Sequence, residues 1–128
     1  MNDSKNPLSP HLQIYRWQIS SLISITHRIT GILNFLGLIF ISAWISSAGI
    51  SENLFEYFLI FLESFIGKFI LIGFTWSISY HLLSGIRHLF WDLGYGYEIK
   101  TANFSGILVI LGSLVLTIIL WVVGKGLV

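Results

Sequence analysis

The chain has 128 residues, of which 55% are hydrophobic, 16% aromatic and only 10% charged. A soluble domain carries about 25% charged residues, so this composition excludes an ordinary soluble protein and indicates a membrane protein. The net charge of +1 gives no indication of nucleic-acid binding. Because the chain lacks cysteine, disulfides, cysteine-ligated zinc and cysteine-ligated iron–sulfur clusters are excluded, and the four histidines are the candidates for metal chemistry.

The first 22 or so residues predict an ordered approach along the membrane surface. Pro7 and Pro10 push the residues before them into extended backbone, and Tyr15 and Trp17 are suited to the membrane–water interface. This segment has neither the apolar stretch of a signal peptide nor the composition of a mitochondrial transit peptide. We therefore expect a bacterial or an organelle-encoded protein.

Three apolar windows, residues 29–50, 65–90 and 104–123, are each long enough to cross a bilayer as a helix, which takes about 20 residues. None shows the alternation of a barrel strand. The sequence therefore predicts an all-α integral membrane protein with three transmembrane helices in a single domain over residues 1–128.

The distribution of charge predicts the orientation in the membrane. Basic residues precede the first span and follow the second: Lys5, Arg16 and Arg28, then Arg87 and Lys100. The loop between the first two spans is acidic and contains Glu52, Glu56 and Glu63. Basic loops remain on the cytoplasmic side. We expect the N-terminus and the second loop in the cytoplasm or matrix, and the acidic loop and Lys125 on the opposite side.

Polar residues gather at the cytoplasmic end of the first span: Ser20, Ser24, His27, Arg28 and Gly31. At helical spacing they share a face, and ionisable residues at membrane depth turn toward a bundle interior or a polar cavity, because lipid exposure costs about 2.5 to 3.5 kcal/mol. Two simpler interpretations stay open. His27 and Arg28 can extend to the phosphates from headgroup level, and the serines can serve helix packing.

In the second span, His81, Gly85 and His88 lie at i, i+4 and i+7 on one helix face, flanked by Ser77 and Ser84. Small residues beside an inward histidine make room for a planar ligand, and neutral imidazole is a common axial ligand of haem iron. His88 is about 10 Å further along the helix, so it would reach the rim of such a haem, with Arg28 and Arg87. The alternative is that His81 is a hydrogen-bonded packing residue. A second axial ligand would have to come from another chain.

Two blocks of sequence carry a family resemblance: PLSPHL with IY over residues 7–15 and SITHRITG over 24–31, and HLLSGIRHLFWDLG over 81–94. They resemble the cytochrome b subunits of succinate dehydrogenase, the larger membrane anchors of respiratory complex II. The chain departs from the family at Asn6, where a basic residue usually precedes the first proline. Because Asn6 is uncharged, there is less reason to expect a charge contact to a neighbouring subunit at this position.

The resemblance implies a role for each matching residue. His81 would be an axial ligand of haem b, and Ser24 and Arg28 would line the ubiquinone pocket. His27, Arg28 and His88 would lie near the haem propionates.

The resemblance also implies the partners and the location. A second small anchor subunit would complete the haem-binding bundle, and an iron–sulfur subunit and a flavoprotein subunit would carry succinate oxidation. The chain would be the non-flavin membrane subunit of this enzyme, in contact with lipid and quinone. Its place would be the bacterial inner membrane or the mitochondrial inner membrane.

Two alternatives stay open from the sequence. The anchor of a fumarate reductase would run the reaction backwards with a quinol. A small helical transporter would explain the hydrophobicity and the few polar positions, with His81 as its one candidate for an ionisable residue near mid-membrane.

Overall fold

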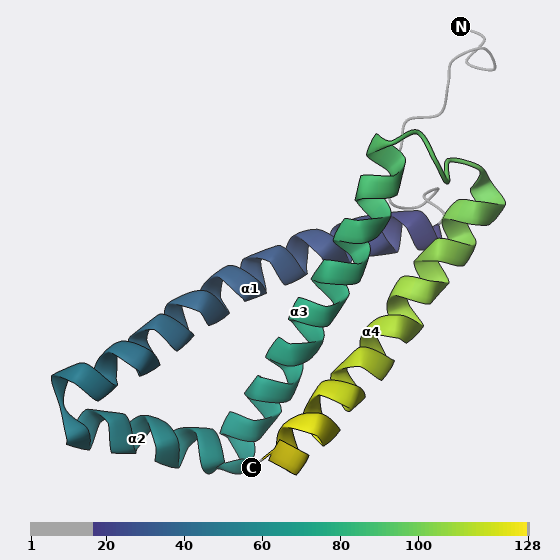
Figure 1. Cartoon of the computed structure of the whole chain (residues 1–128). Coiled ribbons are helices and arrows are strands. Elements are labelled where there is room, and N and C mark those ends of the chain that lie inside the picture. The colour runs from purple at the N-terminus through teal and green to yellow at the C-terminus, as the bar shows by residue number, and fades with distance from the viewer. Residues whose placement is uncertain (1–16, 128) are drawn as a thin grey trace, which may run out of the picture.

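The computed structural model describes residues 17–127. They form four helices, α1 (Ile19–Ile50), α2 (Glu52–Glu63), α3 (Phe65–Asp92) and α4 (Ile99–Leu127) (Figure 1). No strand occurs in this part of the chain, so the predicted all-α fold is confirmed. The expected surface segment with Pro7, Pro10 and Tyr15, and the departure at Asn6, lie outside the described residues.

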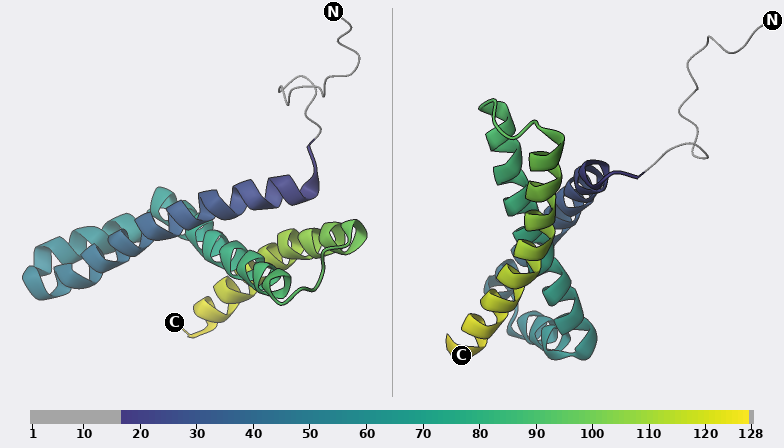
Figure 2. Two further views of the ribbon diagram at one scale, coloured as in Figure 1. Left: turned by 90° about the horizontal axis from the view of Figure 1, so that it is seen from above. Right: turned by 90° about the vertical axis from the view of Figure 1, so that its right-hand side faces the viewer.

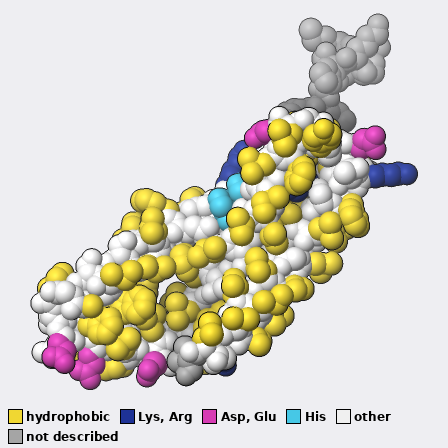
Figure 3. All heavy atoms as spheres, viewed as in Figure 1, with side chains coloured by type: hydrophobic (Ala, Val, Ile, Leu, Met, Phe, Trp, Pro, Cys, Tyr) yellow, Lys and Arg dark blue, Asp and Glu magenta, His cyan; other side chains and the backbone are white. Residues whose placement is uncertain are grey.

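Helices α1, α3 and α4, with 32, 28 and 29 residues, are long and apolar enough to cross a membrane. The three expected spans lie within these helices, each of which extends further at one or both ends. Their large apolar side chains point outward over most of the visible surface (Figure 3). The buried polar side chains are mostly small hydroxyl residues: Thr30, Ser47, Ser77, Ser79, Ser84, Ser113 and Thr117. Small residues between helices and apolar residues outside are typical of a membrane bundle.

Helix α2 corrects one expectation, because the acidic segment between the first two spans is a helix and not a loop. The Ser51 hydroxyl accepts a hydrogen bond from the Leu54 amide at its start, and Ser64 caps the start of α3 in the same way through the Gly67 amide. Aromatic contacts hold α2 against the end of α1, with the Trp44 and Phe55 rings stacked at 6.3 Å. Ionised residues in a segment of mixed polarity do not prevent a helix when caps and packing support it.

Helices α1 and α3 pack closely only along the first half of α1. The ring of Phe74 on α3 leaves no room for a β-carbon at Gly37 of α1. Beyond this point α1 diverges from α3, and α2 bridges the gap between them (Figure 1). The oblique path of α1 relative to the other two long helices is visible from two further directions (Figure 2).

Helices α3 and α4 run side by side, and tryptophan indoles join them. Trp76 Nε1 donates to Ser113 Oγ at 3.2 Å, and Trp121 Nε1 donates to Thr75 Oγ1 at 3.2 Å. The connection between the helices contains Gly94 and Gly96, at φ values of 88° and 82° that favour glycine. We call the end of the molecule that holds the start of α1, the end of α3 and the start of α4 the turn end.

Candidate functional site

His81 is held on α3 by two oxygen atoms of α1. Its Nδ1 lies 3.2 Å from the backbone oxygen of His27 and 3.1 Å from the Thr30 hydroxyl oxygen. A carbonyl oxygen only accepts hydrogen bonds, so Nδ1 carries the proton and the lone pair of this neutral ring is on Nε2. Within the described residues Nε2 has no hydrogen-bond partner, and it is not among the enclosed unpaired atoms. The site therefore presents a free imidazole nitrogen.

Thr30 and Ser77 fix the position of α1 relative to α3 around this histidine. The Thr30 hydroxyl donates to the His27 carbonyl at 2.9 Å and so accepts from His81 Nδ1. The Ser77 hydroxyl lies 3.2 Å from the Thr30 carbonyl oxygen and 2.8 Å from the Asn34 side-chain oxygen. Thr30 and Ser77 are fully buried. Their network specifies the helix register that places His81 against His27.

The three histidines of α1 and α3 form one column of rings. His27 stacks on His81, with ring centroids 4.0 Å apart and an interplanar angle of 9°, and on His88, at 4.8 Å and 27°. His88 Nδ1 lies 2.7 Å from the Ser84 carbonyl oxygen of its own helix, so Nδ1 donates there. The prediction that His81 and His88 share a face holds, and α1 contributes His27 between them.

Two polar atoms beside this column are buried without a partner among residues 17–127. They are Nδ1 of His27 and the hydroxyl oxygen of Ser84. Leaving a buried polar group unsatisfied costs about 1 to 3 kcal/mol.

Two glycines shape the space around the histidines in different ways. A β-carbon at Gly31 would lie 3.2 Å from Cε1 of His81, so α1 comes close to the imidazole at this point. Among residues 17–127, a β-carbon at Gly85 would meet no atom within 4 Å beyond its own turn of α3. The surface next to His81 is thus tight on the α1 side and open beside Gly85. Histidine atoms reach the surface where α1 meets α3 (Figure 3).

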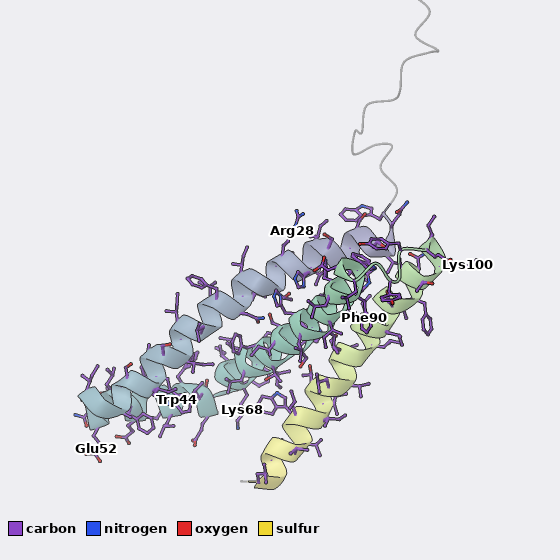
Figure 4. The ribbon with its side chains drawn as sticks, turned by 45° about the horizontal axis from the view of Figure 1, so that its top comes forward. Arg28, Trp44, Glu52, Lys68, Phe90 and Lys100 are labelled. Carbon is purple, nitrogen blue, oxygen red and sulfur yellow. The ribbon has the colours of Figure 1, made fainter. Side chains whose placement is uncertain are left out.

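Ser24 and Arg28 lie one turn apart on α1, beside the histidine column and not within it. Ser24 is half-buried and Arg28 is exposed. The Arg28 side chain points away from α3 and α4 (Figure 4). The expected single polar face of α1 is therefore divided, with His27 and Gly31 toward α3 and Arg28 toward the surroundings. Any pocket that contains Ser24 and Arg28 needs walls from outside residues 17–127.

Arg87 does not take the place expected for it at the rim of the histidine site. Its side chain turns to α4, where Nε donates to the Ser105 hydroxyl at 2.9 Å. Successive residues of a helix are about 100° apart, so Arg87 lies roughly 120° around α3 from His81.

Thr30 is a residue of the site that the sequence analysis did not identify. Its signal was its position three residues after His27, on the same face of α1.

Comparisons with known proteins identify the family of the chain. Residues 2–120 match the family model described as succinate dehydrogenase/fumarate reductase transmembrane subunit. The chain is 43% identical over 119 residues to the succinate dehydrogenase cytochrome b556 subunit of Rickettsia felis, with 93% of each chain covered. It is 42% identical over 123 residues to the subunit of the same name from Paracoccus denitrificans, covering 96% of this chain and 95% of that one. The mitochondrial cytochrome b560 subunit of Mus musculus is 38% identical, over 84% of this chain and 64% of that one. The chain therefore belongs to the family of transmembrane subunits of succinate dehydrogenase and fumarate reductase.

Proposed function

We propose that this chain is the membrane anchor that binds haem b through Nε2 of His81 and contributes Ser24 and Arg28 to the site of ubiquinone reduction. The observation that carries the proposal is the double contact of His81 Nδ1 with the His27 carbonyl and the Thr30 hydroxyl. A histidine that ligates a metal usually donates its other N–H to a carbonyl or a carboxylate, which fixes its tautomer and orientation.

The residues present fit a haem better than a bare metal ion. Residues 17–127 contain no group of three or more potential protein ligands placed to hold an ion, whereas a haem supplies its own four equatorial nitrogens. The open space beside Gly85 lies one turn along α3 from His81, on the same face of the helix. When bound, the haem would take up and pass on single electrons. The second axial ligand is expected from the partner anchor.

His27, Arg28 and His88 are proposed to bind the haem propionates at the turn end. The His27 ring stacks on those of His81 and His88, so it belongs to the same site. His88 donates from Nδ1 to its own helix, so its Nε2 would donate to a carboxylate only in the doubly protonated, charged form of the ring. Arg28 is exposed on α1 one residue after His27. Charge-assisted hydrogen bonds to carboxylates are roughly twice as strong as neutral ones.

Ser24 and Arg28 are proposed to form this chain's share of the quinone pocket. The Ser24 hydroxyl can donate to a quinone carbonyl, and the fixed cation of Arg28 can stabilise the negative charge that develops on the quinone oxygens during reduction. Neither group is an efficient proton donor at neutral pH, so protons would arrive from water or from a partner subunit. In this proposal the protein positions the quinone and the haem and stabilises charge, and the cofactors carry the electrons.

The proposed assembly places the other subunits at the turn end. With this end on the cytoplasmic or matrix side, an iron–sulfur subunit docked there would deliver electrons from a flavoprotein subunit. The partner anchor would cover the side of α1 that carries Arg28. We propose the direction of succinate oxidation because the relatives are named for succinate dehydrogenase. The membrane would be a bacterial or a mitochondrial inner membrane.

Replacing His81 with Leu tests the proposal. The variant should insert normally but lose or alter the low-spin b-type spectrum of the complex, measured as reduced minus oxidised absorbance. Phe69→Leu is the control, because Phe69 is an exposed residue of the same helix, about 18 Å from His81 along its axis. It should leave the spectrum unchanged. An unchanged spectrum in His81→Leu would refute the ligand assignment.

A further inference from the structure

A cavity of about 390 Å³ lies between α3 and α4 at the turn end, on the side of α3 away from the histidines. Its inner part is apolar and is lined by Leu83, Leu108 and Val109. Toward the turn end the lining combines three polar residues with aromatic rings: Arg87, Thr101 and Ser105 with Phe90, Trp91 and Tyr95. The cavity is therefore mostly apolar, and its few polar groups lie toward the ends of the helices, as the headgroup of a lipid would.

Arg87 supplies a buried positive charge to this cavity. The residue is only 5% exposed, and Nη2 donates to the Ala102 carbonyl at 3.0 Å while Nε donates to Ser105. The guanidinium carbon lies 4.0 Å from the centre of the Trp91 ring. Among residues 17–127 these partners of Arg87 are all neutral. A guanidinium has five N–H donors, so donors remain for another acceptor.

A buried cation that contacts only neutral groups favours an anion beside it. Burying an ionised group is costly unless a counter-charge accompanies it. Phe90 also lines the cavity, near the end of α3, and Lys100 marks the start of α4 at the same end (Figure 4). Tyr95 lines the outer part, and aromatic residues of this kind gather at the headgroup level of membranes.

We propose that this cavity binds an anionic phospholipid, with its phosphate at Arg87 and one acyl chain along the apolar inner wall. A quinone would match the shape of the cavity but is neutral, so it would leave the charge of Arg87 uncompensated. The proposed lipid site is separate from the histidine column, because Arg87 faces α4 and His81 faces α1. It therefore does not depend on the assignment of haem or quinone residues.

The test measures lipid retained by the intact complex after exchange into nanodiscs of phosphatidylglycerol or phosphatidylcholine with matched chains, by native mass spectrometry. The wild-type complex should retain phosphatidylglycerol in preference to phosphatidylcholine. Arg87→Gln should lower that retention about tenfold or more, because it removes a hydrogen bond from a charged group. Thr101→Trp, which keeps Arg87 and fills the outer part of the cavity, should lower it too. Lys125→Gln removes a cation at the opposite end of α4 and should change nothing.

Three results would overturn the proposal. The first is equal retention of the two lipids by the wild-type complex, since charge would then play no part. The second is undiminished phosphatidylglycerol in Thr101→Trp, which decides the matter even if Arg87→Gln fails to assemble. The third is displacement of the retained lipid by added ubiquinone, with one ubiquinone bound per complex. This result would make the cavity a quinone site.

Discussion

His81 Nδ1 lies 3.1 Å from the Thr30 hydroxyl oxygen, across the interface between α3 and α1. The same hydroxyl donates to the His27 carbonyl at 2.9 Å, so its proton points away from His81 and its lone pair accepts the imidazole N–H. One buried threonine thus links the tautomer of His81 to the backbone of α1. A ligand nitrogen held in this way is oriented before any iron binds.

Thr30→Val tests this link, because valine keeps the shape of threonine and removes the hydroxyl. The His27 carbonyl remains 3.2 Å from Nδ1, so we expect the haem to bind but less firmly. Loss of a partner of a ligating residue typically costs about tenfold or more in affinity. The measurement is haem content per polypeptide after detergent washing, together with the electron paramagnetic resonance of the ferric haem.

Thr30→Ser is the control for this change, because it restores the hydroxyl without the methyl group. It should recover most of the wild-type haem content and the wild-type resonance. If valine and serine behave alike and both match the wild type, Thr30 has only a packing role.

Gly31→Val should displace the His81 ring. A β-carbon at Gly31 would already be 3.2 Å from His81 Cε1, closer than ordinary van der Waals contact, and the valine methyl groups extend further. We expect a clear loss of haem in the assembled complex, measured by the pyridine haemochrome spectrum. Gly73→Val is the matched control, because a β-carbon at Gly73 meets nothing within 4 Å. Equal haem loss in both variants would point to a general effect of valine in these helices.

The sequence predicted the membrane fold because the spans depend on composition alone, and composition is visible without a structure. It did not predict α2, because the segment between the first two spans, which contains Glu52, Glu56 and Glu63, was expected to be a loop. The helix depends on the Ser51 cap and on packing between the rings of Trp44 and Phe55. Such contacts between elements are not evident from periodicity within one segment.

The candidate site was predicted in part for the same reason. The stripe of His81 and His88 follows from helical spacing within α3, and the structure shows it. The contact of His81 with Thr30 depends on the register between two helices, which a single sequence does not specify. The expected placement of Arg87 at the histidine rim was wrong for a reason the sequence did contain, since six residues do not return a helix to the same face.

Fusions to a reporter test the orientation of the chain. A reporter after Val128 should lie outside the cytoplasm, and a reporter inserted at Glu98 should lie inside, because basic residues collect at the turn end and the acidic residues of α2 lie at the other. Alkaline phosphatase, active only outside, and green fluorescent protein, fluorescent inside, report opposite sides. The reverse pattern would also move the proposed quinone site to the far side of the membrane.

Arg28→Leu tests the proposed part of Arg28 in quinone reduction. If the guanidinium stabilises charge on the quinone, its loss removes a charged hydrogen bond worth about 1.5 to 3 kcal/mol, which lowers the rate of succinate–quinone reduction about tenfold or more. Ser24→Ala should lower it less, because a neutral hydroxyl forms the weaker bond. Succinate oxidation with a soluble dye should stay unchanged in both variants, since that reaction uses the hydrophilic subunits.

Lys68→Leu is the matched control for Arg28→Leu, because it removes an exposed cation near the opposite end of the molecule (Figure 4). It should leave quinone reduction at the wild-type rate. If Arg28→Leu lowers quinone reduction and dye reduction together, the arginine supports assembly of the complex and not the quinone. If it lowers neither, the exposed guanidinium on α1 serves lipid headgroups, and the quinone pocket must be sought among other residues.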